Sequence, residues 1–290
     1  MSNLVNLSKE ELTSFLNSFD NIFCDVDGVL WPRAGSVISG IKETFSKLDN
    51  FNKKVRFVTH NNLLGRNNLH KVLNDIVPGL AIDDVITPIS IIITFLRTIK
   101  FNKEIFFIGH SASKTDLFEA GFKIALSGPE HTEDSLRGVI NNLRDNENIG
   151  AVVLDFDPNV NYLKLVKAIN YLQREDVLFL SASTGTFATI ENRIILGGVM
   201  FQQIIEDASG RSATNFGKPS DALKRYLFNK YTIDSGSRNL FVGDTLDIDI
   251  KFGKLCGFQT LLVGNFKPEN ANQIVPDFYI NNLALLHKII

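Results

Sequence analysis

The chain has 290 residues, of which 44% are hydrophobic and 21% are charged, and its formal net charge is −2. This composition is typical of a soluble globular protein and excludes a disordered or fibrous chain. Because the net charge is close to zero, no overall positive field would attract nucleic acid or an anionic membrane, and we expect neither as a partner.

Nothing in the sequence indicates a secreted or membrane protein. Charged residues interrupt positions 1–20, so we expect no signal peptide there. The longest apolar stretch, 89–96, is too short to span a bilayer. The two cysteines, Cys24 and Cys256, make neither a disulfide framework nor a zinc site, and Cys24 lies among apolar residues of a predicted core. We therefore expect a cytoplasmic protein.

Short apolar runs alternate along the chain with segments of helical periodicity. The first run, 21–24, is followed by apolar residues at helical spacing over 41–48, and amphipathic stretches recur at 162–172 and 221–228. Strands separated by helices in this way predict βαβ units, parallel sheets and hence an α/β fold. The other runs expected as strands are 55–59, 105–108, 151–154, 177–180, 240–242 and 260–263.

Parallel sheets bind ligands beyond the carboxyl ends of their strands, so the residues that follow each strand are informative. Polar residues end or directly follow the predicted strands at 21–24, 55–59 and 240–242. A fourth polar element, Gly217-Lys218-Pro219-Ser220, precedes a helical pattern. The stretch 101–200 contains none of these elements, although it has strand and helix patterns of its own. We predict that 101–200 is an inserted second domain and that 1–100 and 201–290 together form the core domain.

Asp25 and Asp27 leave the first strand two residues apart. Like charges at this range raise one pKa or require a cation, and Mg²⁺ prefers a few carboxylate oxygens together with phosphate and water. Bound Mg²⁺ would keep Asp25 ionised as a nucleophile toward phosphorus, and Asp27 is placed to act as general acid and base. Gly28 would allow a tight turn near a ligand. A lone Asp-x-Asp-Gly is more often a simple turn, so this interpretation depends on the other elements.

A second acidic cluster follows the strand at 240–242. We predict that Asp244 is a direct metal ligand and that Asp249 fixes water molecules or Lys218. Asp247 lies between them and is expected to be solvated or to cap the next helix.

Lys218 and Thr59 supply the remaining groups. Lys218 precedes a helix start, where it could neutralise a phosphoryl oxygen and the charge of Asp25. Thr59 could donate its hydroxyl to the phosphoryl group, although a β-branched residue also simply finishes a strand. Phosphoryl transfer needs a nucleophile, a metal, a cation and hydroxyl or amide donors. The set as a whole therefore predicts a phosphoryl-transfer site.

These motifs resemble those of the haloacid dehalogenase superfamily of aspartate-nucleophile phosphatases. The spacing is most similar to the branch that includes 4-nitrophenylphosphatases, phosphoglycolate phosphatases and pyridoxal phosphatases. The similarity extends over nearly the whole chain, and the stretches that carry it are 23–30, 57–61, 217–220 and 242–250.

The resemblance implies a Rossmann-like α/β core and a large α/β cap inserted between Thr59 and Lys218. It implies that Asp25 is phosphorylated, that Asp27 protonates the leaving group and then activates water, and that Thr59 and Lys218 hold the phosphoryl group. Mg²⁺ would bind the Asp25 carboxylate, the Asp27 backbone carbonyl and Asp244. Substrates would be small phosphate monoesters such as 4-nitrophenyl phosphate, phosphoglycolate or pyridoxal phosphate, and relatives are often dimers through the cap.

The sequence departs from the family in two places. Relatives commonly read Thr/Ser-Asn-Asn-Ser after the second strand, where this chain has Thr59-His60-Asn61-Asn62. We expect Gly28, His60 and Asn61 near the substrate; His60 either adds a pH-dependent contact or faces away and fills space. The second departure is in the cap, where Ala182-Ser183-Thr184-Gly185 and Leu196-Gly197-Gly198 replace the usual segments. The changes over 182–198 leave the substrate open.

Other functions are compatible with parts of this pattern. A phosphoprotein phosphatase would use the same site. A non-catalytic binding protein would keep the fold but lack a nucleophile or a metal ligand, whereas this chain has candidates for both. The acidic cluster disfavours a dehalogenase because it serves phosphate chemistry, and a phosphomutase usually carries a different, helical cap.

Overall fold

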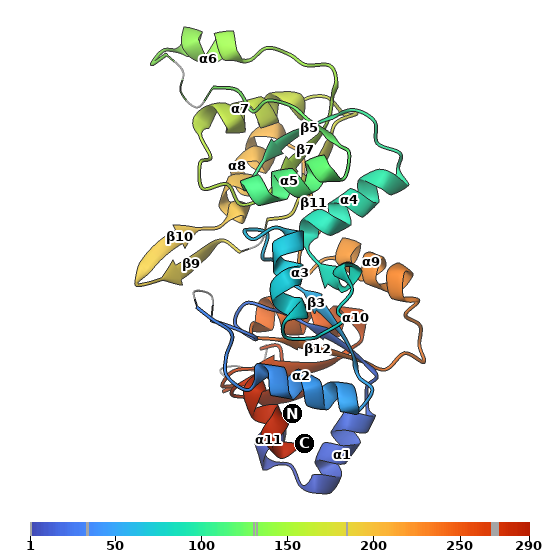
Figure 1. The fold of residues 1–290 in the computed structure, drawn as a ribbon. Coiled ribbons are helices and arrows are strands. Elements are labelled where there is room, and N and C mark those ends of the chain that lie inside the picture. The colour runs from blue at the N-terminus through green and yellow to red at the C-terminus, as the bar shows by residue number, and fades with distance from the viewer. Residues whose placement is uncertain (1, 33–34, 130, 132, 184, 268–272) are drawn as a thin grey trace. The chain divides into compact units, whose positions relative to one another are not determined.

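Parallel sheets organise the chain, and the computed structural model describes residues 2–32, 35–129, 131, 133–183, 185–267 and 273–290. The chain divides into two compact units. The first consists of Met1–Asn61, Arg66–Thr87 and Lys218–Ile290, and the second of Asn62–Gly65 and Pro88–Gly217. Each unit has its own sheet and helices (Figure 1).

The sheet of the first unit has seven strands in the order β1-β14-β13-β12-β2-β3-β4, and every neighbouring pair is parallel. In the register, Cys24 at the end of β2 lies opposite both Val242 of β12 and Phe57 of β3. The carboxyl ends of these three strands therefore lie together. The strands are β1 (Ser2–Asn3), β2 (Asn21–Cys24), β3 (Lys54–Val58), β4 (Val85–Ile86), β12 (Asn239–Gly243), β13 (Gln259–Val263) and β14 (Phe278–Ile280).

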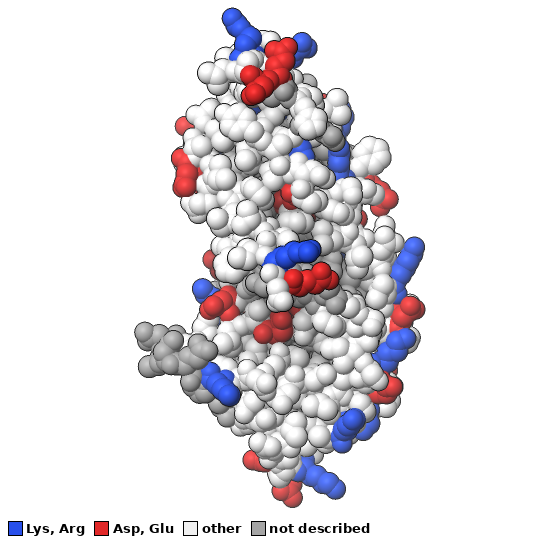
Figure 2. All heavy atoms as spheres, turned by 90° about the vertical axis from the view of Figure 1, so that its left-hand side faces the viewer, with Lys and Arg blue, Asp and Glu red and all other residues white. Residues whose placement is uncertain are grey.

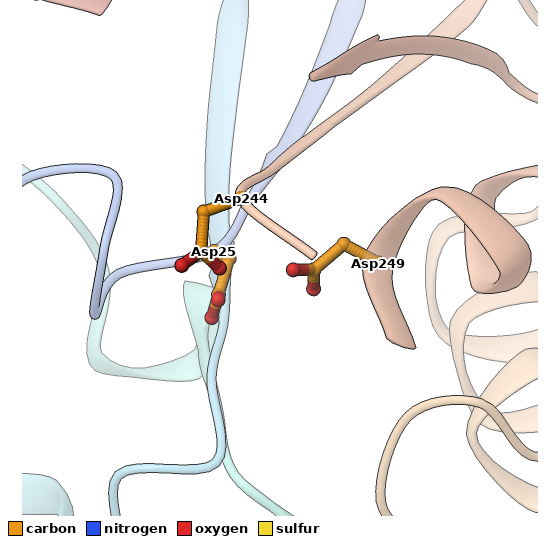
Figure 3. A group of neighbouring side chains, drawn as sticks. All are labelled: Asp25, Asp244 and Asp249. Atoms are coloured by element: carbon orange, nitrogen blue, oxygen red, sulfur yellow. The ribbon is translucent and has the colours of Figure 1, made fainter. Parts of the chain in front are cut away.

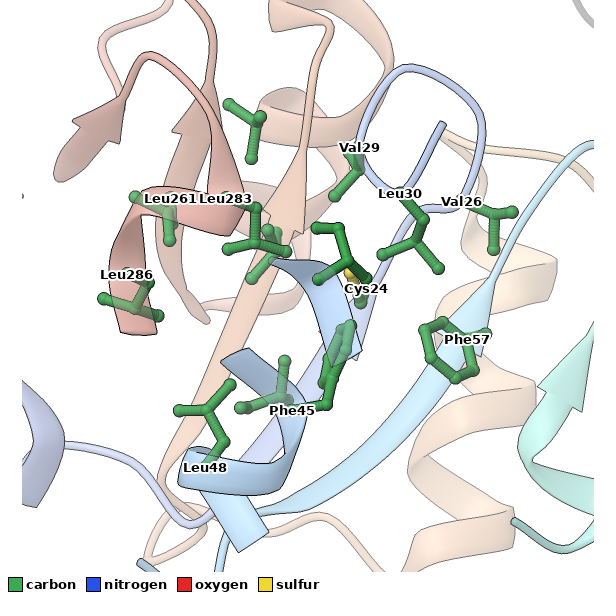
Figure 4. Close-up of a cluster of buried hydrophobic side chains, with 14 of the residues drawn as sticks. Cys24, Val26, Val29, Leu30, Phe45, Leu48, Phe57, Leu261, Leu283 and Leu286 are labelled. Atoms are coloured by element: carbon green, nitrogen blue, oxygen red, sulfur yellow. The ribbon is translucent and has the colours of Figure 1, made fainter. Parts of the chain in front are cut away.

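Both faces of the central strand β2 are buried, as expected for a parallel sheet covered by helices. Its side chains alternate between two apolar layers. Cys24 packs with Phe45 and Leu48 of α2 (Figure 4), and Ile22 belongs to the same cluster. Phe23 stacks on Phe258 on the opposite face. The helices of this unit are α1 (Lys9–Asn17), α2 (Ile41–Asn50), α3 (Arg66–Asn74), α9 (Asp221–Tyr231), α10 (Lys251–Cys256) and α11 (Leu286–Ile289), with short turns η1 (Leu4–Asn6), η2 (Ile82–Asp84), η3 (Leu246–Ile250) and η4 (Leu283–Leu285).

The second unit contains a five-stranded parallel sheet in the order β11-β8-β7-β5-β6 and a separate antiparallel pair, β9 and β10. The strands are β5 (Glu104–Ile108), β6 (Lys123–Ile124), β7 (Ile149–Leu154), β8 (Leu178–Ser181), β9 (Phe187–Ile190), β10 (Arg193–Leu196) and β11 (Thr214–Asn215). The helices are α4 (Pro88–Thr98), α5 (Ser111–Glu119), α6 (Leu136–Asn142), α7 (Tyr162–Tyr171) and α8 (Gly198–Ser209).

The second unit is wider than the predicted insertion 101–200 at both ends. Helix α4 belongs to it because Phe95 packs against Phe216 near the other end of the unit, with ring centroids 5.4 Å apart. The polar loop between β3 and α3 also contributes Asn62–Gly65. In the sequence, 89–96 is only the longest apolar stretch, and its packing partner could not be inferred from that pattern.

The predicted strands at 21–24, 55–59, 105–108, 151–154, 177–180, 240–242 and 260–263 all correspond to strands, with ends shifted by two residues at most. The hairpin of β9 and β10, the three-residue strand β14 and the two-residue strands β1, β4, β6 and β11 were not predicted, because such short segments carry little periodicity. Cys24 and Cys256 are free and buried.

No helix among the described residues has the length and apolar character needed to cross a membrane. On the face shown in Figure 2, basic and acidic side chains are interspersed rather than gathered into a field of one sign. The expected lack of nucleic-acid and membrane partners stays a prediction.

Candidate active site

The site lies in the first unit, where strands β2, β3 and β12 end. Asp25 directly follows β2 and continues the ladder, because its backbone N–H donates to Val242 O at 2.8 Å. The chain then turns sharply, with Gly28 N donating to Trp31 O at 2.7 Å. Val26 and Leu30 are buried and anchor this turn in the core, which fixes the direction of the Asp25 side chain.

Three carboxylates converge at this edge of the sheet. One oxygen each of Asp25, Asp244 and Asp249 lies within 4.8 Å of the others (Figure 3). Asp25 and Asp249 are buried, and Asp244 is partly exposed. Carboxylate oxygens grouped in this way are suited to a hard divalent cation such as Mg²⁺.

Two glycines allow these carboxylates to approach the backbone. A Cβ atom on Gly28, whose φ is +88°, would lie 2.1 Å from Asp244 Oδ2. A Cβ atom on Gly243 would lie 2.2 Å from the Cβ of Asp249. The sequence suggested that Gly28 permits a turn; the structure adds that it leaves room for Asp244.

We expect Gly28→Ala to disturb the position of Asp244 and therefore to lower metal-dependent turnover. Gly79→Ala is a matched control, because Gly79 has a similar φ of +84° but nothing within 4 Å of a Cβ atom. Both variants carry backbone strain of about 1–2 kcal/mol. Urea unfolding and turnover assays compare them: equal losses of activity in both would contradict the role of Gly28.

Lys218 joins two of the carboxylates. Its Nζ lies 2.8 Å from Asp25 Oδ1 and 2.7 Å from Asp249 Oδ1, and it also donates to Val58 O at 2.8 Å. Burial disfavours the charge of Lys218, but the Asp249 and Asp25 carboxylates outweigh it and raise the pKa of the ammonium. Lys218 is therefore a permanently charged cation at 3% exposure.

The two carboxyls beside Lys218 differ in their surroundings. Burial and, to a smaller extent, the Asp249 carboxylate raise the pKa of Asp25 to about 8, against the opposing charge of Lys218. The pKa of Asp249 is lowered instead: burial opposes ionisation, but Lys218 and a hydrogen bond from Thr245 Oγ1 at 2.6 Å prevail. Without a further cation, Asp249 is the ionised partner of Lys218 and Asp25 is the carboxyl that a metal would ionise.

Both oxygens of Asp249 are already engaged. Oδ1 accepts from Lys218, and Oδ2 accepts from the backbone N–H and the hydroxyl of Thr245. The expectation was that Asp249 fixes water molecules or Lys218, and the contact with Lys218 is the one that the structure contains. Asp247 is exposed and lies within η3, which Thr245 precedes as N-cap residue, so Asp247 is solvated rather than a cap.

Asp27 forms a second group with residues after β3. Trp31 Nε1 donates to Asp27 Oδ1 at 2.9 Å, and Asn61 Nδ2 donates to the same oxygen at 3.2 Å. Thr59 Oγ1 lies 3.5 Å from Asp27 Oδ2 and accepts from Asn61 N at 3.0 Å. The side chain of Asp27 is thus oriented by its neighbours and lies outside the carboxylate cluster that could hold a metal.

His60 holds the backbone of Lys218. The backbone N–H of Lys218 donates to His60 Nε2 at 2.6 Å, so the ring proton is assigned to Nδ1. Burial and the charge of Lys218 lower the pKa of His60 to about 3. The ring is neutral near pH 7 and supplies an acceptor, which neither interpretation from the sequence anticipated.

Sequence reasoning missed Trp31 and Thr245, which orient Asp27 and Asp249 respectively. Trp31 is the only tryptophan of the chain and follows an apolar pair in the turn after the Asp motif. Because a buried indole N–H needs an acceptor, its position four residues after Asp27 was the available signal. Of the altered cap segment 182–198, Thr184 lies outside the described residues.

Comparisons with known proteins agree with this geometry. A model of haloacid dehalogenase-like hydrolases matches residues 22–123, and a second model of HAD-like hydrolases matches 215–286. Phosphoglycolate phosphatase 2 of Arabidopsis thaliana is 29% identical over 98% of this chain and 97% of its own length. Human glycerol-3-phosphate phosphatase is 28% identical over 97% of this chain and 94% of its own length.

Solved structures show the same fold. The p-nitrophenyl phosphatase from Archaeoglobus fulgidus superposes with a TM-score of 0.75 at 22% identity, over 94% of this chain and 99% of that one. The 4-nitrophenylphosphatase from Thermotoga maritima gives 0.75 at 24% identity, over 94% and 98%. On the two family models, which match 22–123 and 215–286, the chain belongs to the haloacid dehalogenase-like hydrolases.

Proposed function

We propose that the protein is a Mg²⁺-dependent phosphatase of small-molecule phosphate monoesters that acts through a phosphorylated Asp25. The observation that carries the proposal is the position of the Asp25 carboxylate, 2.8 Å from the buried Lys218 ammonium and within the cluster of Asp244 and Asp249. A carboxylate is a poor nucleophile toward a dianionic phosphate unless nearby positive charge offsets the repulsion.

The residues present suit Mg²⁺. Asp25, Asp244 and the backbone carbonyl of Asp27 would hold the ion, and the space beside Gly28 that a Cβ would fill is consistent with a closely fitted site. When bound, the ion neutralises phosphoryl oxygens and keeps Asp25 ionised.

The remaining steps belong to the side chains. The Asp25 carboxylate attacks phosphorus and displaces the alkoxide, which takes a proton from Asp27. Asp27 then removes a proton from water, whose oxygen attacks the phosphoaspartate, releases inorganic phosphate and restores Asp25. Lys218 and the Thr59 hydroxyl stabilise the phosphoryl oxygens. Trp31 and Asn61 fix the orientation of the Asp27 carboxyl group by donating hydrogen bonds to one of its oxygens.

A panel assay tests the proposal. We expect hydrolysis of 4-nitrophenyl phosphate and of at least one among phosphoglycolate, glycerol 3-phosphate and pyridoxal phosphate, with no turnover of a phosphoserine peptide. EDTA should abolish the activity and added Mg²⁺ should restore it. Undiminished turnover in EDTA would contradict the metal requirement.

The Mg²⁺ affinity should depend on pH. Because burial raises the pKa of Asp25 to about 8, Mg²⁺ must displace a proton from this carboxyl below that pH. The Mg²⁺ affinity should then rise about tenfold per pH unit up to pH ~8.

A homodimer formed through the second unit is part of the proposal. The β9–β10 hairpin exposes Phe187, Ile194 and Leu196, and an isolated hairpin with apolar residues on its surface is marginally stable alone. A second copy would cover this surface, and light scattering measures the mass in solution.

Location in the cytoplasm is likewise a proposal, which cell fractionation tests.

A further inference from the structure

One loop connects the candidate active site to a buried network in the second unit. One of the four boundaries between the two units falls at the peptide bond between Asn61 and Asn62. On one side of it, Asn61 donates through Nδ2 to Asp27 and through its backbone N–H to Thr59 Oγ1. On the other side, Asn62 belongs to the second unit. Because Asn61 and Asn62 share a peptide bond, a contact that restrains Asn62 also restrains the backbone of Asn61, whose side chain donates to Asp27.

Asn62 is fixed by Asp155. Asn62 Nδ2 donates to Asp155 Oδ1 at 3.0 Å, and the two residues are 7% and 3% exposed. Asp155 directly follows β7, and its backbone N–H continues the ladder by donating to Ile108 O at 2.8 Å. Asn62 is thus attached to a rigid position at the end of a central strand.

The Asp155 carboxyl is itself held on both oxygens. Oδ1 also accepts from Phe156 N at 2.7 Å, and Oδ2 accepts from Ser113 Oγ at 2.6 Å. Burial raises the pKa of Asp155, against these hydrogen bonds. A buried carboxyl costs free energy to maintain, so a network of this kind either makes the local structure unique or serves the site next to it.

We propose that Asn62 and Asp155 are positioning residues for the hydrolytic reaction: their hydrogen bond holds the loop 59–62 so that Thr59 and Asn61 keep Asp27 in register. Neither residue needs to touch the substrate. The inference rests on the proposed function, because Asp27 must transfer a proton for its orientation to matter. A displacement of about 1 Å at a reacting group can cost on the order of 10²-fold in rate.

Four variants separate positioning from simple stabilisation. Asn62→Ala and Asp155→Ala remove the bond from either side. Asp155→Asn is the conservative variant, because the amide oxygen can accept from Asn62 and Phe156 while the NH₂ group donates to Ser113 Oγ. Asp157→Ala is the matched control: Asp157 is 5% exposed on the same loop, pairs with Lys164 at 2.7 Å, and makes no bond to Asn62.

We expect kcat to fall about tenfold or more in Asn62→Ala and in Asp155→Ala, with KM within about twofold of wild type. The double variant should be no slower than Asp155→Ala alone, since both remove one bond. Asp155→Asn should retain kcat, and Asp157→Ala should lower the Tm without lowering kcat. A folded Asn62→Ala with the kcat of wild type would overturn the proposal.

Amide hydrogen exchange provides a readout that is independent of activity. The peptide spanning 59–65 should exchange faster in Asn62→Ala and Asp155→Ala but not in Asp157→Ala, because only the first two release the loop. Unchanged amide exchange in both Asn62→Ala and Asp155→Ala would also overturn the proposal. A wild-type protein that hydrolyses no ester on the panel would instead overturn the proposed function, and the exchange data would then stand alone.

Discussion

Asp25→Asn is expected to abolish turnover of 4-nitrophenyl phosphate, by about 10³-fold or more, while the protein remains folded. The amide has no charge to attack phosphorus and is a weaker ligand for a divalent cation. Its size matches the carboxyl, so the buried turn after β2 should be preserved. Asp247→Asn is the control, because Asp247 is an exposed member of the second acidic cluster. Full activity of Asp25→Asn would rule out this nucleophile.

The same variant has a distinct stability profile in EDTA. Burial raises the pKa of Asp25 to about 8, above the value of ~3.9 typical of an unfolded chain. The folded state therefore prefers the protonated carboxyl, and the contribution of Asp25 to wild-type stability falls as the pH rises from ~4 to ~8. The side-chain amide of the variant does not titrate, so the difference in unfolding free energy should increase over this range, by about 1.4 kcal/mol per unit of pKa shift, and then level off. Urea unfolding at several pH values measures it; a difference that is constant with pH would contradict the raised pKa.

Lys218→Met is expected to have the second large effect, on stability as well as on activity. Lys218 is buried between Asp25 and Asp249, and its removal leaves two buried carboxyls without their cation. Breaking a buried ion pair from one side typically costs about 3–5 kcal/mol. The loss should be larger at high pH, where both carboxyls are ionised, and phosphatase activity should disappear with the cation.

The control for this prediction is Lys254→Met. Lys254 pairs with Asp277 at the surface, where both side chains are about two-fifths exposed, so its loss should cost about 0–1 kcal/mol. If Lys218→Met does not fold, Lys218→Met/Asp249→Asn should recover folding because it removes one of the stranded charges, without recovering turnover. If Lys218→Met lowers the free energy of unfolding no more than Lys254→Met does, the buried contacts of Lys218 with Asp25 and Asp249 are not important to stability.

The sequence predicted the members of the site because of a general property of parallel sheets. Asp25, Thr59 and Asp244 each follow an apolar run, and the carboxyl ends of parallel strands meet at one edge. Strand adjacency was not needed for that argument, although the structure shows that β2 lies directly between β3 and β12. For Asp249 the sequence left two partners open, water molecules or Lys218, and Lys218 Nζ lies 2.7 Å from Asp249 Oδ1.

Local pattern could not reveal the contacts between distant residues. His60 and Lys218 are 158 positions apart, and only the tertiary structure shows that the ring accepts from the Lys218 backbone. The partner of Asn62 is 93 positions away, which is why Asn62 read simply as a departure from the usual family motif. The limits of the second unit were missed for the same reason, because α4 is assigned by its packing and not by its periodicity.

The order of strands in the first sheet has a consequence for synthesis on the ribosome. β12 pairs with β2 on one side and β13 on the other, and β1 pairs with β14, so this sheet combines segments that are far apart in the sequence. The residues of the second unit, by contrast, have all been translated by Gly217. The nascent β2 therefore has an unpaired edge until more than two hundred further residues have been translated, and the carboxylate cluster can assemble only after Asp249 has been translated.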